Sequence, residues 1–379
     1  MRYFVKLFIT VAVTGTVMSC NRNSGALPVI NLDDISENNY IDLKLSDFMK
    51  DIEVIDLETT SDNLFTSLGS AAYITATSII IRNDKAFYQF DRKGKYMGKL
   101  AERGRGPKEF TYIAYCFADE ETNILYFVDY RDQKAIRRID IESGQHLEPL
   151  SFDLKGLEIG CCKNNHIYGL PSTNNSYWNE DANPDTSVVA FQYDLQSESM
   201  KKYYGNRKYT ILPMGNSMVA YRSHVSLFNM HYSDTLYRLQ DEKLHPLFIV
   251  KMSTKMTNYR EGGDFITLLF EYENGIVFTK GSIAYRNSNG MELLQGRDDH
   301  YLHVSRAGAL KTIRQLLINP LDIIIQTKAL TQASAAISHG DHRAFDRIIY
   351  PFPIVSGSYG YLLVEQEEDN PKIIIGKVK

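Results

Sequence analysis

The fold is decided by residues 86–144, which read AFYQFDRKGKYMGKLAERGRGPKEFTYIAYCFADEETNILYFVDYRDQKAIRRIDIESG. Short runs that alternate apolar and polar residues, such as Ala86–Phe90 and Ile124–Val128, have the period of a β-strand. The runs end in turn-forming clusters such as Asp91–Gly94 and Ile141–Gly144, because glycine reaches positive φ and aspartate bonds its own backbone. Many short strands joined by regular turns predict a β-sandwich, a barrel or a propeller.

The spacing of these units favours the propeller. An aromatic residue or isoleucine followed by aspartate recurs at Phe90-Asp91, Ile139-Asp140 and Tyr193-Asp194, with a weaker copy at Tyr237-Arg238. The copies lie about 50 residues apart, which is the length of a propeller blade. From Glu53 onward the chain accommodates six blades of about 54 residues, while seven shorter blades, five blades with insertions or a pair of β-sandwiches remain alternatives. We therefore predict an all-β, six-bladed β-propeller over residues 51–379.

The unit Tyr96–Leu147 resembles the NHL-type propeller repeat in its glycine-rich loop ending in Phe110 and in the two strands that end at Asp129 and Asp140. The whole chain resembles the six-bladed β-propeller lipoproteins of Bacteroidetes. Four stretches carry this likeness: Glu53–Thr60, Gly104–Phe110, Ser233–Leu239 and Asp369–Ile375. The resemblance implies a closed ring of blades on an exported protein.

A closed ring must pair its ends, because open strand edges invite aggregation. We expect Ile52–Leu57 and Ile373–Val378 to lie in one closing blade. Leu310–Leu317 departs from the strand pattern, since its apolar residues recur at a helical period, and residues 321–337 are rich in helix-favouring Ala, Leu and Gln. We therefore expect a small helical insertion at about residues 308–340.

The first 20 residues predict export. Arg2 and Lys6 precede an uncharged apolar run, Leu7–Val17, which is too short to span a bilayer. Val17–Cys20 resembles a bacterial lipobox, which implies that Cys20 carries the lipid; an ordinary signal peptide is the alternative. We divide the chain into a lipoprotein signal peptide (1–19), a tether and N-terminal segment (20–50) and the propeller. The expected place is the cell envelope, on the outer membrane, and facing the periplasm is favoured because Asn21–Asn23 has no acidic run.

Composition disfavours a nucleic-acid partner, since the net charge is −4 and binding to nucleic acid depends on basic patches. Beyond Cys20 three cysteines remain, and we expect either free thiols or a disulfide that joins Cys116 to Cys161 or Cys162. No zinc-type ligand spacing is present in the sequence, so we expect no metal and no other cofactor.

A search for catalytic motifs finds no nucleophile elbow, zinc-protease helix or phosphate-binding loop in the sequence. His300 and His303 would point to opposite faces of a strand. His339, Asp341 and His342 surround a glycine in an expected turn, and we interpret them as solvated loop residues. We therefore assign no catalytic residue.

The most informative polar segment joins an outer strand of one blade to the inner strand of the next, on the face where the central channel opens. We select Arg103, Arg105, Glu109 and Tyr112 as candidate ligand-binding residues. The guanidinium fork of Arg105 suits a carboxylate or a sugar acid. Tyr112, Tyr115 and Tyr130 suit a glycan or a peptide, and packing in the core is the alternative for them. The alternative is a purely structural loop in which Arg–Glu pairs tie adjacent blades.

These observations predict a non-enzymatic binding or scaffolding lipoprotein whose partners are the bacterial membrane, through its anchor, and a glycan, a peptide or an envelope protein. A periplasmic lyase or hydrolase with acidic and histidine residues in the channel is one alternative. A sensor or accessory subunit of a nutrient-uptake complex is another.

Overall fold

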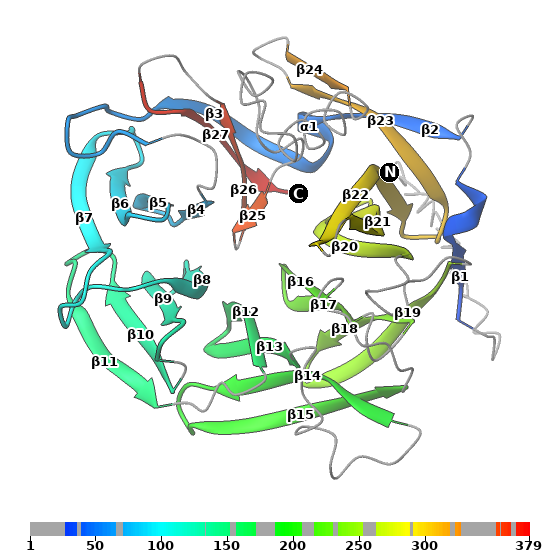
Figure 1. Cartoon of the computed structure of the whole chain (residues 1–379), viewed down its shortest axis with the longest axis horizontal. Helices are drawn as coiled ribbons and strands as arrows, with labels where there is room; N and C mark the ends of the chain where they lie inside the picture. Colours follow the sequence, from blue (N-terminus) through cyan, green and yellow to red (C-terminus); the bar gives the residue numbers. More distant parts are fainter. Residues whose placement is uncertain are drawn as a thin grey trace, which may run out of the picture.

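The computed structural model describes residues 27–35, 39–65, 71–132, 134–151, 157–171, 186–206, 216–229, 234–252, 263–288, 291–318, 323–326, 354–356, 358–364 and 369–379. The strands in these residues form six sheets. Figure 1 shows the sheets as blades around a common axis, which confirms the six-bladed β-propeller. None of the helices in the described part of the chain is long and apolar enough to span a membrane.

The blades follow one another in chain order. Blade 1 contains β4 (Ala71–Ile74), β5 (Ser78–Arg82), β6 (Ala86–Asp91) and β7 (Tyr96–Glu102). Blade 2 contains β8 (Ile113–Asp119), β9 (Ile124–Asp129), β10 (Ala135–Asp140) and β11 (His146–Ser151). Blade 3 contains β12 (Leu157–Lys163), β13 (His166–Pro171), β14 (Thr186–Asp194) and β15 (Ser199–Asn206).

The second half of the ring adds strands from elsewhere in the chain. Blade 4 contains β16 (Asn216–Tyr221), β17 (His224–Asn229), β18 (Thr235–Gln240), β19 (Lys243–Lys251) and β1 (Val29–Asn31). Blade 5 contains β20 (Gly263–Tyr272), β21 (Gly275–Ser288), β22 (Met291–Ser305), β23 (Leu310–Ile318), β2 (Tyr40–Lys44) and β24 (Ile323–Gln326). Blade 6 contains β25 (Ile354–Ser356), β26 (Tyr359–Val364), β27 (Lys372–Val378) and β3 (Met49–Asp56).

The innermost strands β4, β8, β12, β16, β20 and β25 surround the axis in Figure 1. We call the end of the ring at which β7 leads into β8 the loop face. Ile113, at the start of β8, pairs with Asp129, at the end of β9. The turn after β9 therefore lies on the loop face together with the β7–β8 connection.

The ring closes as expected. β3 pairs antiparallel with β27, so Ile55 lies opposite Ile373 in one blade built from both ends of the chain. Asn370 reinforces this closure from a fully buried position. Its side chain accepts a hydrogen bond from Phe65 N (3.0 Å) and donates to Glu58 O (3.0 Å) and to Asn63 Oδ1 (3.2 Å).

The segment ahead of β3 contributes strands to two further blades. β1 adds to β19 and β2 adds to β23, and both pairings are parallel. The short helices η1 (Leu32–Asp34) and α1 (Leu45–Phe48) separate these strands. Because Leu32, Leu45 and Phe48 are buried, this part of the expected tether and N-terminal segment packs against the propeller.

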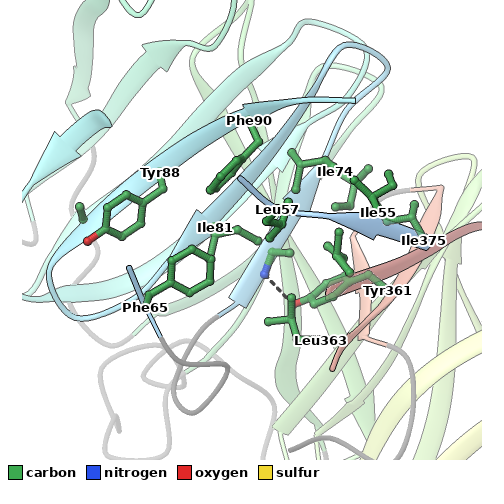
Figure 2. Packing of buried hydrophobic residues seen from close by; sticks show 14 residues of the cluster. Ile55, Leu57, Phe65, Ile74, Ile81, Tyr88, Phe90, Tyr361, Leu363 and Ile375 are labelled. Carbon is green, nitrogen blue, oxygen red and sulfur yellow. Dashed lines mark hydrogen bonds between the residues drawn. The ribbon is translucent and has the colours of Figure 1, made fainter. Parts of the chain in front are cut away.

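Six apolar clusters fill the six junctions between blades, and alternation along each strand divides its residues between two of them. Ile79 and Ile81 pack toward blade 6, whereas Ile80 between them packs toward blade 2. Figure 2 shows the junction of blades 6 and 1, where the Tyr361 hydroxyl accepts a hydrogen bond from Ala72 N (2.8 Å). Both faces of a blade are therefore buried, which explains the continuous apolar runs in the sequence.

The expected helical insertion is wrong where the structure describes it. Residues 310–318 form β23 and residues 323–326 form β24, while the rest of the range 308–340 after residue 318 lies outside the described residues. The helical spacing misled because Leu310 packs into the junction of blades 4 and 5, whereas Ile313 packs into the junction of blades 5 and 6. Residues three apart on a strand point to opposite faces, so both can be apolar when both faces of the strand are buried.

Candidate ligand-binding site

The β7–β8 connection is a tight loop held by its own backbone. Gly104 N donates to Phe110 O (2.8 Å), and Glu109 N donates to Gly106 O (3.1 Å). Arg103 N donates to Lys85 O (2.7 Å), which fastens the loop to the β5–β6 turn. The apolar end of the loop, Phe110, is buried. The loop is therefore a fixed platform between blades 1 and 2.

The side chain of Glu109 folds back onto its own loop and bonds the loop backbone. Its carboxylate accepts a hydrogen bond from Gly106 N (2.6 Å). A Cβ atom on Gly104 would lie 1.9 Å from Glu109 Oε2, so the glycine leaves the space that this carboxylate occupies. The Arg137 guanidinium donates to Glu109 O (2.6 Å) and fixes the same turn from β10. Glu109 therefore stabilises the turn through hydrogen bonds to the backbone, and not through the expected Arg–Glu ion pair.

Tyr112 and Tyr130 form an exposed aromatic pair on the loop face. Their side chains are 64% and 61% exposed, and the ring centroids lie 6.2 Å apart at an interplanar angle of 86°. Tyr130 N donates to Tyr112 O (2.8 Å), which holds the two backbones together. Exposed tyrosines combine an apolar ring with a polar hydroxyl group.

Asp129 fixes the backbone beneath this pair. Its carboxylate accepts hydrogen bonds from Thr111 Oγ1 (2.5 Å) and Thr111 N (2.8 Å). Burial acts to raise the pKa of Asp129, but the hydrogen bonds from Thr111 outweigh it, so the pKa lies below its usual range. The carboxylate stays ionised at neutral pH and keeps the two tyrosine-bearing segments in register.

Cationic side chains lie on the same two segments as the tyrosine pair. Arg103, Arg105 and Lys108 are exposed on the loop, and Arg131 is exposed beside Tyr130. Among the described residues, no carboxylate lies within ion-pair distance of these four side chains. We call the group formed by Arg103, Arg105, Lys108, Tyr112, Tyr130 and Arg131 the loop-face patch. It offers guanidinium and aromatic surface together.

The positive potential extends inward from the patch. His146, on β11, lies against Leu100 O (3.1 Å). Burial lowers the pKa of His146, the contact with the Leu100 carbonyl opposes this, and the nearby charges of Lys108 and Arg137 lower it further. The patch therefore suits an anionic ligand.

The candidate residues chosen from the sequence include some, but not all, of the residues in the loop-face patch. Arg103, Arg105 and Tyr112 lie in it, whereas the candidate Tyr115 is half-buried in the junction of blades 2 and 3. Arg131 was missed, because a single arginine in a turn carries no motif. Its position directly after Tyr130 was the available signal.

The other polar groups considered from the sequence do not assemble a metal site. Within the described residues, no group of three or more His, Cys, Asp or Glu side chains could hold a metal ion. Cys116, Cys161 and Cys162 are free thiols, so the disulfide alternative is wrong. His303 is buried against the Tyr272 hydroxyl (3.0 Å), and the cluster at residues 339–342 lies outside the described residues.

A second polar cluster lies between blades 4 and 5. The fully buried carboxylate of Glu271 accepts from Ser226 Oγ and the Arg306 guanidinium, and it lies 2.8 Å from Arg238 Nη2 and 3.1 Å from His224 Nε2. Burial acts to raise the pKa of Glu271, but the nearby imidazole of His224 and the hydrogen bond from Ser226 prevail and lower it to about 2. Both carboxylate oxygens already have partners within the fold, so we interpret this cluster as a tie between blades.

Comparisons with known proteins agree with the fold. The profile of a family described as a domain of unknown function, DUF4934, matches residues 27–282, which is more than half of the chain. No curated protein matches the sequence.

Among solved structures, a putative exported protein from Bacteroides fragilis is 12% identical with a TM-score of 0.56, and the match covers 90% of this chain and 98% of that one. The extracellular domain of a putative hybrid two-component system from B. thetaiotaomicron is 9% identical with a TM-score of 0.43, over 86% of this chain and 39% of that one. The first likeness supports a shared propeller fold.

Proposed function

The chain belongs to the DUF4934 family, and we propose that this member is a binding protein of the bacterial envelope that holds an anionic glycan on its loop-face patch. The observation that carries the proposal is the exposed, perpendicular pair Tyr112 and Tyr130 among cations that have no carboxylate partner in the described residues.

The patch matches the chemistry of an acidic sugar. The face of a sugar ring that carries its C–H groups is apolar and stacks on a tyrosine ring, while the tyrosine hydroxyl bonds the sugar hydroxyls. A guanidinium such as that of Arg103 or Arg105 binds the carboxylate of a sugar acid through two parallel hydrogen bonds. Such exposed aromatic and arginine side chains are the residue types that dominate binding energy at protein surfaces.

The proposed place is the bacterial envelope. The signal sequence and Cys20 support lipid attachment, and the solved structure with the higher of the two TM-scores is described as an exported protein. Two or more acyl chains hold a protein on a bilayer where one chain does not. We further propose attachment to the outer membrane on its periplasmic side.

The entry of the tether suits this role. β1, which follows the tether, lies across the ring from β7 and β8 in Figure 1. The loop-face patch lies at the junction of β7 and β8, so an anchor ahead of β1 is attached at the far side of the ring from the patch. The two alternatives, an enzyme with a catalytic channel and a subunit of an uptake complex, stay predictions.

Binding is tested with the purified lipoprotein in detergent. The panel contains oligosaccharides with uronic acids, the same oligosaccharides after reduction of their carboxyl groups, and acidic peptides of equal charge. We expect the uronic-acid oligosaccharides to bind, and Tyr112→Ala and Tyr130→Ala each to weaken binding at least tenfold, which is about 1.4 kcal/mol.

Met97→Ala is the matched control, because Met97 is 59% exposed on β7 of the adjoining blade but lies outside the patch. It should bind as the wild type does. Equal affinity for the reduced oligosaccharides, binding of the peptides alone, or unchanged binding by both tyrosine variants would each overturn the proposal.

A further inference from the structure

A polar cluster lies below the loop-face patch, in the junction between blades 1 and 2. It consists of Arg82 at the end of β5, Tyr73 on β4 and Cys116 on β8. Ala71 pairs with Arg82 and Tyr73 pairs with Ile80, so the arginine and the tyrosine come from neighbouring strands of one sheet.

Alternation along β5 gives the direction of Arg82. Ile80 packs into the junction of blades 1 and 2, whereas Ile79 and Ile81 pack into the junction of blades 6 and 1. Arg82 is two residues from Ile80 and therefore lies on the side of blade 2. Tyr73 and Cys116 pack against that same apolar cluster, which brings all three side chains to one junction.

Arg82 has no counter-charge there. It is half-buried, and its Nε atom is buried with no hydrogen-bond partner. Within the described residues, no carboxylate lies within ion-pair distance of its guanidinium. The neighbouring groups cannot neutralise it, because burial raises the pKa of Cys116 to about 12 and holds the pKa of Tyr73 well above its usual value.

An unpaired charge in a partly dry site is unfavourable for the fold, since the lost hydration has no replacement. A bound anion removes this cost. We propose that the junction of blades 1 and 2 binds a carboxylate through the guanidinium of Arg82, whose planar fork matches the two carboxylate oxygens.

Arg82 lies near the loop face, because it directly precedes the β5–β6 turn to which Arg103 is bonded. The carboxylate has two possible sources: a free small acid, or an acidic residue of the glycan. In the second case the inference rests on the proposed function, and Arg82 then determines the preference for the acidic sugar.

The first experiment measures thermal unfolding of the full protein while sodium chloride is replaced by sodium acetate or sodium glucuronate at constant ionic strength. We expect a saturable rise in Tm for the wild type, because a ligand that binds the native state stabilises it. Arg82→Met should abolish this rise. Arg82→Lys should raise the anion concentration needed for half of the rise at least tenfold. Lys93→Met, on an exposed cation outside the patch, should keep the wild-type response.

The second measurement separates binding from structure. If Arg82 serves a ligand, Arg82→Met should be at least as stable as the wild type in chloride, because an unpaired charge is replaced by an apolar chain of similar length. A large loss of stability in Arg82→Met, with a wild-type anion response in Arg82→Lys, would assign Arg82 to the fold and overturn the proposal.

The outcomes distinguish this site from the loop-face patch. A free-acid source predicts that Tyr112→Ala keeps the acetate response. A glycan source predicts that the free acids have no effect and that uronic-acid oligosaccharides bind. It also predicts that Arg82→Met binds the uronic-acid oligosaccharides and the reduced oligosaccharides with equal affinity. The inference is overturned if the wild type responds to none of these acids, whether free or part of a glycan. If no glycan binds but acetate still raises the Tm in a way that requires Arg82, only the proposed function is overturned.

Discussion

Replacing Glu271 with glutamine should destabilise the propeller by about 3 kcal/mol at pH 7. The carboxylate is fully buried and its pKa is lowered from 4.5 to about 2, and each pKa unit corresponds to about 1.4 kcal/mol. Breaking a buried ion pair costs about 3–5 kcal/mol, and the lower end applies because Arg238 and Arg306 are 23% and 38% exposed and regain some water. Glutamine keeps the volume but turns an amide donor toward the two guanidinium groups.

The pH dependence gives an independent check. A carboxyl group whose pKa is lowered in the folded state stabilises the fold above its unfolded pKa, and the stabilisation is lost as the pH falls through the folded pKa. The difference in free energy of unfolding between wild type and Glu271→Gln should therefore be complete above about pH 5 and shrink toward pH 2.

Urea unfolding at pH 7, 4.5 and 3 measures this difference from the two midpoints. Glu273→Gln is the matched control, because Glu273 lies two residues further on and is exposed, so its change should stay within about 0.5 kcal/mol. A loss below about 1 kcal/mol for Glu271→Gln at pH 7, or a difference that does not change between pH 4.5 and pH 3, would refute the assignment of Glu271 as the tie between blades 4 and 5.

Three further predictions concern the closing blade, a turn and a thiol. Asn370→Ala removes three buried hydrogen bonds and should lower the free energy of unfolding by about 3 kcal/mol in urea, whereas Asp369→Ala on the exposed neighbouring position should change it by less than about 0.5 kcal/mol. Gly94→Ala should cost more than Gly144→Ala in the same assay, although both glycines have positive φ. The new Cβ would lie 2.0 Å from a backbone oxygen at Gly94, whereas at Gly144 it would make only an ordinary contact with Leu100 (3.9 Å), so that about 1 kcal/mol of backbone strain remains there. Cys116, whose pKa burial raises to about 12, should react with iodoacetamide at pH 8 at least 100-fold more slowly in the folded protein than in urea, and equal rates would contradict its burial.

The repeat and the strands of the closing blade could be predicted because each strand and turn follows a short-range pattern. Turns such as Asp91–Gly94 recur at blade length, and Ile373–Ile375 gives an apolar strand at the end of the chain. The β7–β8 loop could be located for the same reason, since glycines at 104 and 106 mark a tight turn between two strands. The turns and the loop are determined by neighbours within a few residues, whereas the closing blade was predicted because a ring must pair its end strands.

Features that depend on contacts between blades could not be predicted. The helical spacing of Leu310 and Ile313 arises because they face different neighbouring blades. The parallel additions of β1 and β2 were missed because a three-residue or five-residue strand on the outer edge of a blade has too little pattern to identify it. Their pairing depends on strands β19 and β23, which follow much later in the chain.

The two buried polar groups show why a repeat sequence conceals its functional residues. Arg82 ends an apolar strand and leads into the polar turn Asn83–Lys85, whereas Arg238 is a single polar residue between Tyr237 and Leu239, so neither stands out in the sequence. Their surroundings differ, because blade 5 supplies Glu271 to Arg238, whereas the described part of blade 2 supplies Cys116 and no carboxylate to Arg82. Of these two junctions, the one with an uncompensated charge gains more from a ligand, and it lies beneath the exposed tyrosines of the same face.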